Sequence, residues 1–138
     1  MAAAQKARVV YTPVVIGLGI DLVETERLSR ALARTAGFEA RVFTEGESAA
    51  CAVRGDRLQA LAARFAAKEA CLKALGTGWS GGLGFRQVEV VREGNGAPGL
   101  RLHGAAAARA ASLGVTRIHV SLTHQVSAAA AVVVLERG

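Results

Sequence analysis

Cysteine, proline and aromatic residues are scarce in this 138-residue sequence. Its two cysteines, Cys51 and Cys71, match neither a CxxC metal motif nor the dense spacing of a disulfide framework. We expect both to be ordinary core thiols in a reducing cytoplasm. Four phenylalanines, one tyrosine and one tryptophan offer few rings for stacking against bases, which argues against a nucleic-acid-binding surface.

Long hydrophobic runs are also missing. The longest purely apolar stretch, Ala128 to Leu135, has eight residues, whereas a helix that crosses a bilayer needs about 20. The start of the chain resembles a secretory signal, but Asp21 interrupts its apolar stretch and no small-residue cleavage site follows. We therefore expect neither a membrane span nor a signal peptide, and we place the protein in the cytoplasm.

Basic residues and alanine are what the sequence has in excess. Lysine and arginine number 17 against 11 acidic residues, so the net charge of +6 favours association with an anionic partner. The anionic partner could be a nucleotide-like cofactor, an acidic protein or nucleic acid. Much of the 51% hydrophobic content is alanine, which buries little apolar area. We expect one domain whose thin core gains from oligomerisation.

Hydrophobic periodicity and turn signals predict an α+β fold, with helices packed on one face of a mainly antiparallel sheet. A capping box at Thr44 to Glu47 and a similar signature at Asp56 to Gln59 each mark the start of a helix. We expect neighbouring subunits to cover the sheet edges. The predicted strands are 14–20, 85–92, 100–103, 115–122 and 128–136. The predicted helices are 25–34, 56–75, 105–113 and one that begins at Thr44.

Asp21, at the end of the first predicted strand, and Glu69, within the long helix, form the best candidate pair for chemistry. Magnesium is typically held by one or two carboxylates, with water and substrate phosphates completing its shell, so two carboxylates from different elements suffice. Lys73 follows Glu69 by four residues and is predicted to pair with it, whereas Lys68 points about 100° away. The alternative for these residues is simple exposure to solvent.

Other candidates carry weaker signals. The segment Gly76 to Gly84 has five glycines in nine residues, but it follows a helix instead of opening one and lacks the pattern of a P-loop. His124 in a polar turn could bind a phosphate or adjust a base, or it could simply be exposed. Arg27 and Arg34 form a basic stripe that is either solvated or a dock for an acidic helix.

Two segments resemble the signature motifs of the holo-[acyl-carrier-protein] synthase family. The first is GIDLVE at 19–24, with Arg27 after it, and the second is RFAAKEACLKALGTG at 64–78. Three shorter segments agree as well: RVFT at 41–44, GAP at 96–98 and SLTH at 121–124. The resemblance covers nearly the whole chain, from Val14 to Glu136.

The resemblance implies a 4′-phosphopantetheinyl transferase fold that forms a homotrimer, with coenzyme A in a cleft between neighbouring subunits. Asp21 and Glu69 would hold Mg²⁺ as the cofactor, and the metal would also bind the pyrophosphate of the substrate coenzyme A. A serine of an acidic acyl carrier protein would attack the β-phosphate and release adenosine 3′,5′-bisphosphate. Glu69 or a metal-bound water would deprotonate the serine, and Lys73 would offset the developing charge.

The resemblance also assigns binding residues. The residues assigned to docking of the carrier protein are Arg27, Arg34 and Phe38. The carrier would serve fatty-acid or polyketide synthesis. The residues assigned to the coenzyme A cleft are Arg41, Arg64, Lys73, Gly76, Thr77, Gly78, Pro98 and His124.

The chain departs from the family pattern at two places. Residues 1–13 form an N-terminal extension ahead of the transferase domain at 14–138, and the usual short members lack it. Gln125 stands where a small or acidic residue is more usual. Three alternatives remain open: an enzyme of another class that reuses the fold, a coenzyme A or carrier-binding module without turnover, and a basic nucleic-acid-binding protein with steeply salt-dependent binding.

Overall fold

The computed structural model describes residues 12–78 and 83–138. Most of the predicted N-terminal extension and residues 79–82 of the predicted glycine-rich loop lie outside this range. In chain order the elements are β1 (Val14–Glu24), α1 (Thr25–Arg34), α2 (Phe38–Val42), α3 (Glu45–Ala52), α4 (Arg57–Leu75), the 3₁₀ turn η1 (Phe85–Gln87), β2 (Val88–Arg92), β3 (Pro98–Leu102), α5 (Gly104–Leu113), β4 (Arg117–His124) and β5 (Ala128–Arg137).

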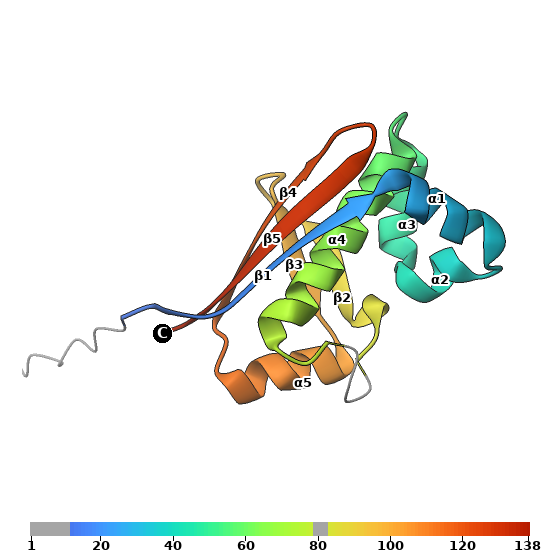
Figure 1. Cartoon of the computed structure of the whole chain (residues 1–138). Helices are drawn as coiled ribbons and strands as arrows, with labels where there is room; N and C mark the ends of the chain where they lie inside the picture. The colour runs from blue at the N-terminus through green and yellow to red at the C-terminus, as the bar shows by residue number, and fades with distance from the viewer. Residues whose placement is uncertain (1–11, 79–82) are drawn as a thin grey trace, which may run out of the picture.

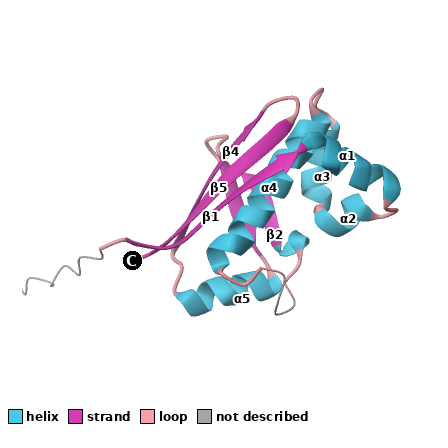
Figure 2. Cartoon of the chain, in the orientation of Figure 1, coloured by secondary structure: helices cyan, strands magenta, loops and turns pink. Residues whose placement is uncertain are grey.

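The strands form two antiparallel sheets. One has the order β1-β5-β4, and the other is the hairpin β2-β3. In Figures 1 and 2, α4 runs along the three-stranded sheet, α1, α2 and α3 gather near one end of α4, and α5 lies near the other. The predicted α+β architecture with a mainly antiparallel sheet is confirmed. Across the described residues, no helix combines the length and apolar character needed to span a bilayer.

Helix α4 is the centre of the core. Its predicted apolar face is confirmed, since Leu61, Leu72 and Leu75 are at most 1% exposed. Alanines fill much of the rest of its surface and let neighbouring elements approach closely. The helix ends at Gly76, as predicted, because that glycine adopts a left-handed backbone with φ of 74° that most other residues avoid.

The three-stranded sheet buries one face and leaves apolar side chains on the other. Along β5, alternate residues such as Val133 and Leu135 are fully buried. On β1 the outward side chains of Leu18, Ile20 and Leu22 are 64%, 66% and 69% exposed. A contiguous exposed apolar face of this kind is typical of an interaction surface.

Several predicted boundaries were wrong. β1 continues past Asp21 to Glu24, because its last residues still pair with β5. Residues 85–87 form η1 instead of a strand, and β2 begins at Val88. Thr123 and His124, predicted as a turn, are the last residues of β4, and α2 has no counterpart among the predicted helices.

The two predicted helix starts differ in their capping. The box at Thr44 is confirmed, since its hydroxyl accepts from the Glu47 amide at 3.2 Å and the Glu47 carboxylate accepts from the Thr44 amide at 2.9 Å. Asp56 does precede α4, but its side chain makes no cap hydrogen bond. Its carboxylate is held by the guanidinium of Arg54 instead. The predicted cap at Asp56 was therefore wrong, although the helix starts where expected.

Candidate active site

Two glycines bring β1 directly against α4. A Cβ atom on Gly19 would lie 1.8 Å from the Ala70 carbonyl oxygen, and one on Gly17 would lie 2.5 Å from that of Ala74. No side chain fits at either position, so the strand backbone rests on the helix backbone. This close approach carries the next inward residue, Asp21, to the helix face that bears Glu69 and Lys73.

Asp21, Glu69 and Lys73 form a small polar cluster at this contact. The Lys73 Nζ atom donates to Asp21 Oδ1 at 3.0 Å and to the Ile20 carbonyl at 3.0 Å. In the described part of the chain, the ion pair of Lys73 is with Asp21, and the charge of Lys73 also acts on Glu69, as predicted. The Lys73 side chain is 56% exposed, whereas that of Asp21 is 19% exposed.

Burial and the neighbouring charges shift the pKa of Glu69. Burial raises the pKa of the Glu69 carboxyl, the charge of Asp21 raises it further, and Lys73 opposes both effects. Two carboxylates that repel each other in a half-buried site favour either a shared proton or a cation. The structure therefore brings the two predicted metal ligands together.

The donor set suits magnesium better than zinc. Within residues 12–78 and 83–138 no group of three or more histidines, cysteines or carboxylates could hold a metal ion. Magnesium needs no such cage, because one or two carboxylates suffice when water and substrate phosphates supply the remaining oxygens. Asp21 and Glu69 fit that requirement.

A cavity of about 460 Å³ opens in front of the carboxylates, and we call it the carboxylate cavity. Its lining includes Asp21, Glu69, Arg27, Phe38 and Phe65, which come from β1, α1, α2 and α4. Phe65 packs against Phe38 with ring centroids 6.5 Å apart. Two predicted docking residues thus share a cavity with the predicted metal ligands.

The third predicted docking residue lies farther along α1. Arg34 lines a separate shallow hollow together with Arg27 and Arg30. The basic stripe predicted from Arg27 and Arg34 is therefore a row of three arginines, and Arg30 was missed.

A second cavity, of about 190 Å³, collects positive charge. We call it the basic pocket. Arg64, Pro98 and His124, all predicted to bind coenzyme A, line it together with Arg54 and Arg92. The latter two were missed because nothing in the local sequence connects the end of α3 or β2 with His124. In a single chain, the basic pocket and the carboxylate cavity are lined by different side chains.

The remaining predicted binding residues lie on exposed segments. Arg41 is an exposed residue of α2. Gly76 and Gly78 both have positive φ values, 74° and 53°, and are exposed, with half-buried Thr77 between them. The guanidinium of Arg109 on α5 donates to the Leu75 carbonyl at 3.1 Å and so supports the end of α4 from which this turn departs.

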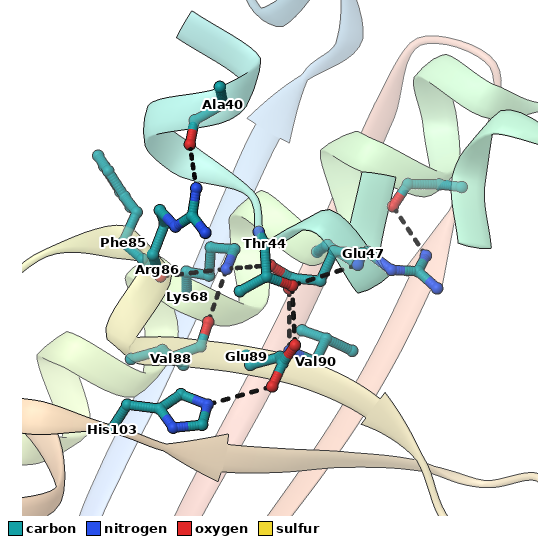
Figure 3. Close-up of polar contacts among 12 residues, drawn as sticks. Ala40, Thr44, Glu47, Lys68, Phe85, Arg86, Val88, Glu89, Val90 and His103 are labelled. Atoms are coloured by element: carbon teal, nitrogen blue, oxygen red, sulfur yellow. Dashed lines mark hydrogen bonds and ion pairs between the residues drawn. The ribbon is translucent and has the colours of Figure 1, made fainter. Parts of the chain in front are cut away.

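Lys68 lies on the other side of α4, as predicted, and takes part in a network that sequence reasoning missed. Figure 3 shows its Nζ atom among Glu47, the Phe85 carbonyl and the Val88 carbonyl, at 2.6, 3.1 and 2.6 Å. Lys68 and Glu47 are both fully buried. This network ties α4 to α3, η1 and β2 and so supports the helix that carries Glu69.

Comparison with known proteins points to the same family as the sequence motifs. The model of the 4′-phosphopantetheinyl transferase superfamily matches residues 17–132. Relatives named holo-[acyl-carrier-protein] synthase include one from Methylobacterium radiotolerans, 49% identical over 127 residues, covering 88% of this chain and 93% of that protein. Another, from Anaeromyxobacter sp. strain K, is 50% identical over 127 residues and covers 88% and 96%.

Solved structures agree with the sequence matches. A holo-(acyl-carrier-protein) synthase from Bacillus anthracis, in complex with CoA (3′,5′-ADP), is 34% identical with a TM-score of 0.72, covering 90% of this chain and 98% of that one. The holo-[acyl-carrier-protein] synthase from Neisseria meningitidis is 31% identical with a TM-score of 0.79, covering 90% and 100%. The chain therefore belongs to the 4′-phosphopantetheinyl transferase superfamily, and it is an enzyme of that kind.

Proposed function

We propose that this enzyme is a magnesium-dependent holo-[acyl-carrier-protein] synthase. It moves the 4′-phosphopantetheine group of coenzyme A to a serine of apo acyl carrier protein and releases adenosine 3′,5′-bisphosphate. The observation that carries the proposal is that Asp21 and Glu69 line one cavity with Arg27, at the contact where Lys73 binds Asp21. The names of the relatives support the same activity.

The residues of the cluster have distinct roles in this proposal. Asp21 and Glu69 would hold magnesium, which neutralises and orients phosphate oxygens when bound. Glu69 would accept the proton of the serine hydroxyl as a general base. The serine Oγ bonds to the β-phosphorus while the bond from that phosphorus to the bridging oxygen breaks, and the bisphosphate leaves with the electron pair. The exposed ammonium of Lys73 can turn toward the transferring phosphoryl group and offset its charge.

The basic pocket is the proposed site for phosphate groups of coenzyme A. Arg64 and His124 line it, together with Arg54 and Arg92. Arginines suit phosphate because their planar guanidinium groups donate two parallel hydrogen bonds. A relative from Helicobacter pylori, 27% identical with a TM-score of 0.73 and covering 86% of this chain and 98% of that one, was solved in complex with coenzyme A.

The α1 face is the proposed dock for the carrier protein. Arg27, Arg30 and Arg34 lie beside the carboxylate cavity and give this surface a positive charge. An acidic carrier would be steered to it and oriented with its serine toward Glu69. Phe38 adds an apolar contact at the cavity wall.

The exposed face of β1 supports the proposal of a homotrimer. Leu18, Ile20 and Leu22 leave a row of apolar side chains that a neighbouring subunit would cover. Assembly would also allow the basic pocket of one subunit to face the carboxylate cavity of the next, which explains why the two sets of predicted residues line separate cavities in one chain. A cytoplasmic location and service to fatty-acid or polyketide synthesis complete the proposal.

Intact-mass spectrometry of an apo acyl carrier protein, incubated with this enzyme, coenzyme A and magnesium, tests the function. The expected result is a gain of about 340 Da, one phosphopantetheine on a serine, that disappears with a chelator. No gain with several different carriers would refute the proposal and favour a binding module. A gain that persists in the chelator would refute only the role of magnesium.

A further inference from the structure

Asp56 touches two walls of the basic pocket at once. Its carboxylate accepts from Arg54 Nε at 2.7 Å and from Arg54 Nη2 at 2.9 Å. The same Oδ2 atom that accepts from Arg54 Nη2 also lies 3.5 Å from His124 Nε2. Arg54 and His124 both line the basic pocket. A single carboxylate therefore engages two of the groups that an incoming anion would use.

The pocket has a further donor that Asp56 does not engage. Arg64 is 8% exposed, and its Nε atom is buried without a hydrogen-bond partner among the described residues. Its Nη1 atom makes a long bond of 3.3 Å to the Ala60 carbonyl. A buried N–H group without a partner costs free energy, and an anion in the pocket would satisfy it.

We propose that Asp56 is an internal competitor for the anionic ligand of the basic pocket, whose phosphate must take Arg54 and His124 from it. This inference rests on the proposed function, which assigns the pocket to phosphate groups of coenzyme A. The product adenosine 3′,5′-bisphosphate keeps the phosphates of the nucleotide end. Asp56 therefore weakens the binding of substrate and product alike and favours release of the product.

A phosphate can replace the Asp56 carboxylate as the partner of Arg54. A guanidinium binds both anions with the same two-pronged geometry, so Arg54 can pass from one to the other. The Arg54 and Asp56 side chains are 32% and 38% exposed, and ion pairs at such exposure are weak. The hydrogen bonds from Arg54 also hold the pKa of Asp56 at about 2, so the carboxylate is ionised at neutral pH.

The variant Asp56→Asn tests the inference because it removes the charge while keeping the size of the side chain. We expect calorimetric titration with adenosine 3′,5′-bisphosphate, without metal, to show about three- to tenfold tighter binding, with the larger gain at low salt. The control is Glu26→Gln on α1, where an exposed carboxylate pairs with Arg30. It changes the net charge equally, and its affinity should match that of the unmodified enzyme.

A double-mutant cycle with Arg54→Ala separates competition from a general effect of charge. In the unmodified enzyme Asp56 occupies Arg54, so the loss of Arg54 should weaken binding only slightly. In the Asp56→Asn background the same loss should weaken it severalfold more. The inference would be overturned if Asp56→Asn and the unmodified enzyme bound the bisphosphate equally well, or if the effects in the cycle were additive. Either result would leave the proposed function standing. No bisphosphate binding by any variant would also overturn the assignment of the pocket.

Discussion

The Nζ atom of Lys68 lies 2.6 Å from Glu47 Oε1, and neither side chain is exposed to solvent. Burial lowers the pKa of Lys68, and the charge of Glu47 counteracts that shift. The second oxygen of Glu47 accepts from the Val90 amide at 2.9 Å, so the pair joins α3, α4 and β2 (Figure 3). Each charge is tolerated only because the other is present.

Replacing Glu47 by alanine should be strongly destabilising. The change leaves the Lys68 ammonium buried without its counter-ion and removes the acceptor of the Thr44 and Val90 amides. We expect the free energy of unfolding to fall by about 3–5 kcal/mol, measured by urea denaturation. Glu45→Ala, on the exposed first turn of the same helix, is the control and should change stability little. Equal losses in both variants would show that the buried pair has no special importance.

Gly19→Ala should separate β1 from α4. The new methyl group would meet the Ala70 carbonyl at 1.8 Å, and a backbone atom cannot move aside as a side chain does. We expect a loss of at least about 1–3 kcal/mol and a fall in transferase activity, because Asp21 moves with the strand. Gly55→Ala is the matched control, since nothing lies within 4 Å of its new methyl group. A Gly19→Ala variant as stable and active as the control would refute the close contact.

Asp21→Ala and Glu69→Ala should each abolish magnesium-dependent turnover while the thermal midpoint changes little. Both side chains line the carboxylate cavity, and neither belongs to the buried core. We expect kcat to fall by at least about 100-fold in the mass-based transfer assay. Full activity in both variants would eliminate these residues as metal ligands.

Arg27→Glu should raise the KM for the carrier protein and leave the KM for coenzyme A nearly unchanged. The substitution reverses a charge in the lining of the carboxylate cavity, where an acidic carrier would approach. Arg101→Glu on β3 makes the same change in net charge at an exposed position away from α1 and serves as the control. An unchanged KM for the carrier would remove the docking proposal.

Glu89 should make stability sensitive to acid. Hydrogen bonds from Thr44 and from His103 lower the pKa of Glu89 below its ordinary value of 4.5. In the window below 4.5 the unfolded chain therefore binds more protons than the folded one, and stability falls as the pH falls. We expect Glu89→Gln to flatten this fall in denaturation experiments below pH 4.5. An identical acid profile in the variant would contradict the predicted effect.

Features that depend on neighbouring residues were predictable from the sequence. The capping box at Thr44 and the left-handed Gly76 that ends α4 require only residues a few positions apart. The apolar face of α4 follows from helical periodicity in the same way. The resemblance to known motifs identified Asp21 and Glu69 as partners, which composition and spacing alone left as two exposed carboxylates.

Contacts between distant segments required the tertiary structure. Lys73 acts on Glu69 one turn away, as predicted, but the approach of β1 at Gly19 also presents Asp21, which forms the hydrogen-bonded ion pair. Arg54 and Arg92 join His124 in the basic pocket only because the turn between α3 and α4 meets β2 and β4 there. The sequence by itself determined the family, the two ends of α4 and the residue types of the site. The long-range partners of charged side chains, such as Asp21 for Lys73 and Glu47 for Lys68, were decided by packing, since a charge pairs with whatever the fold brings within hydrogen-bonding distance.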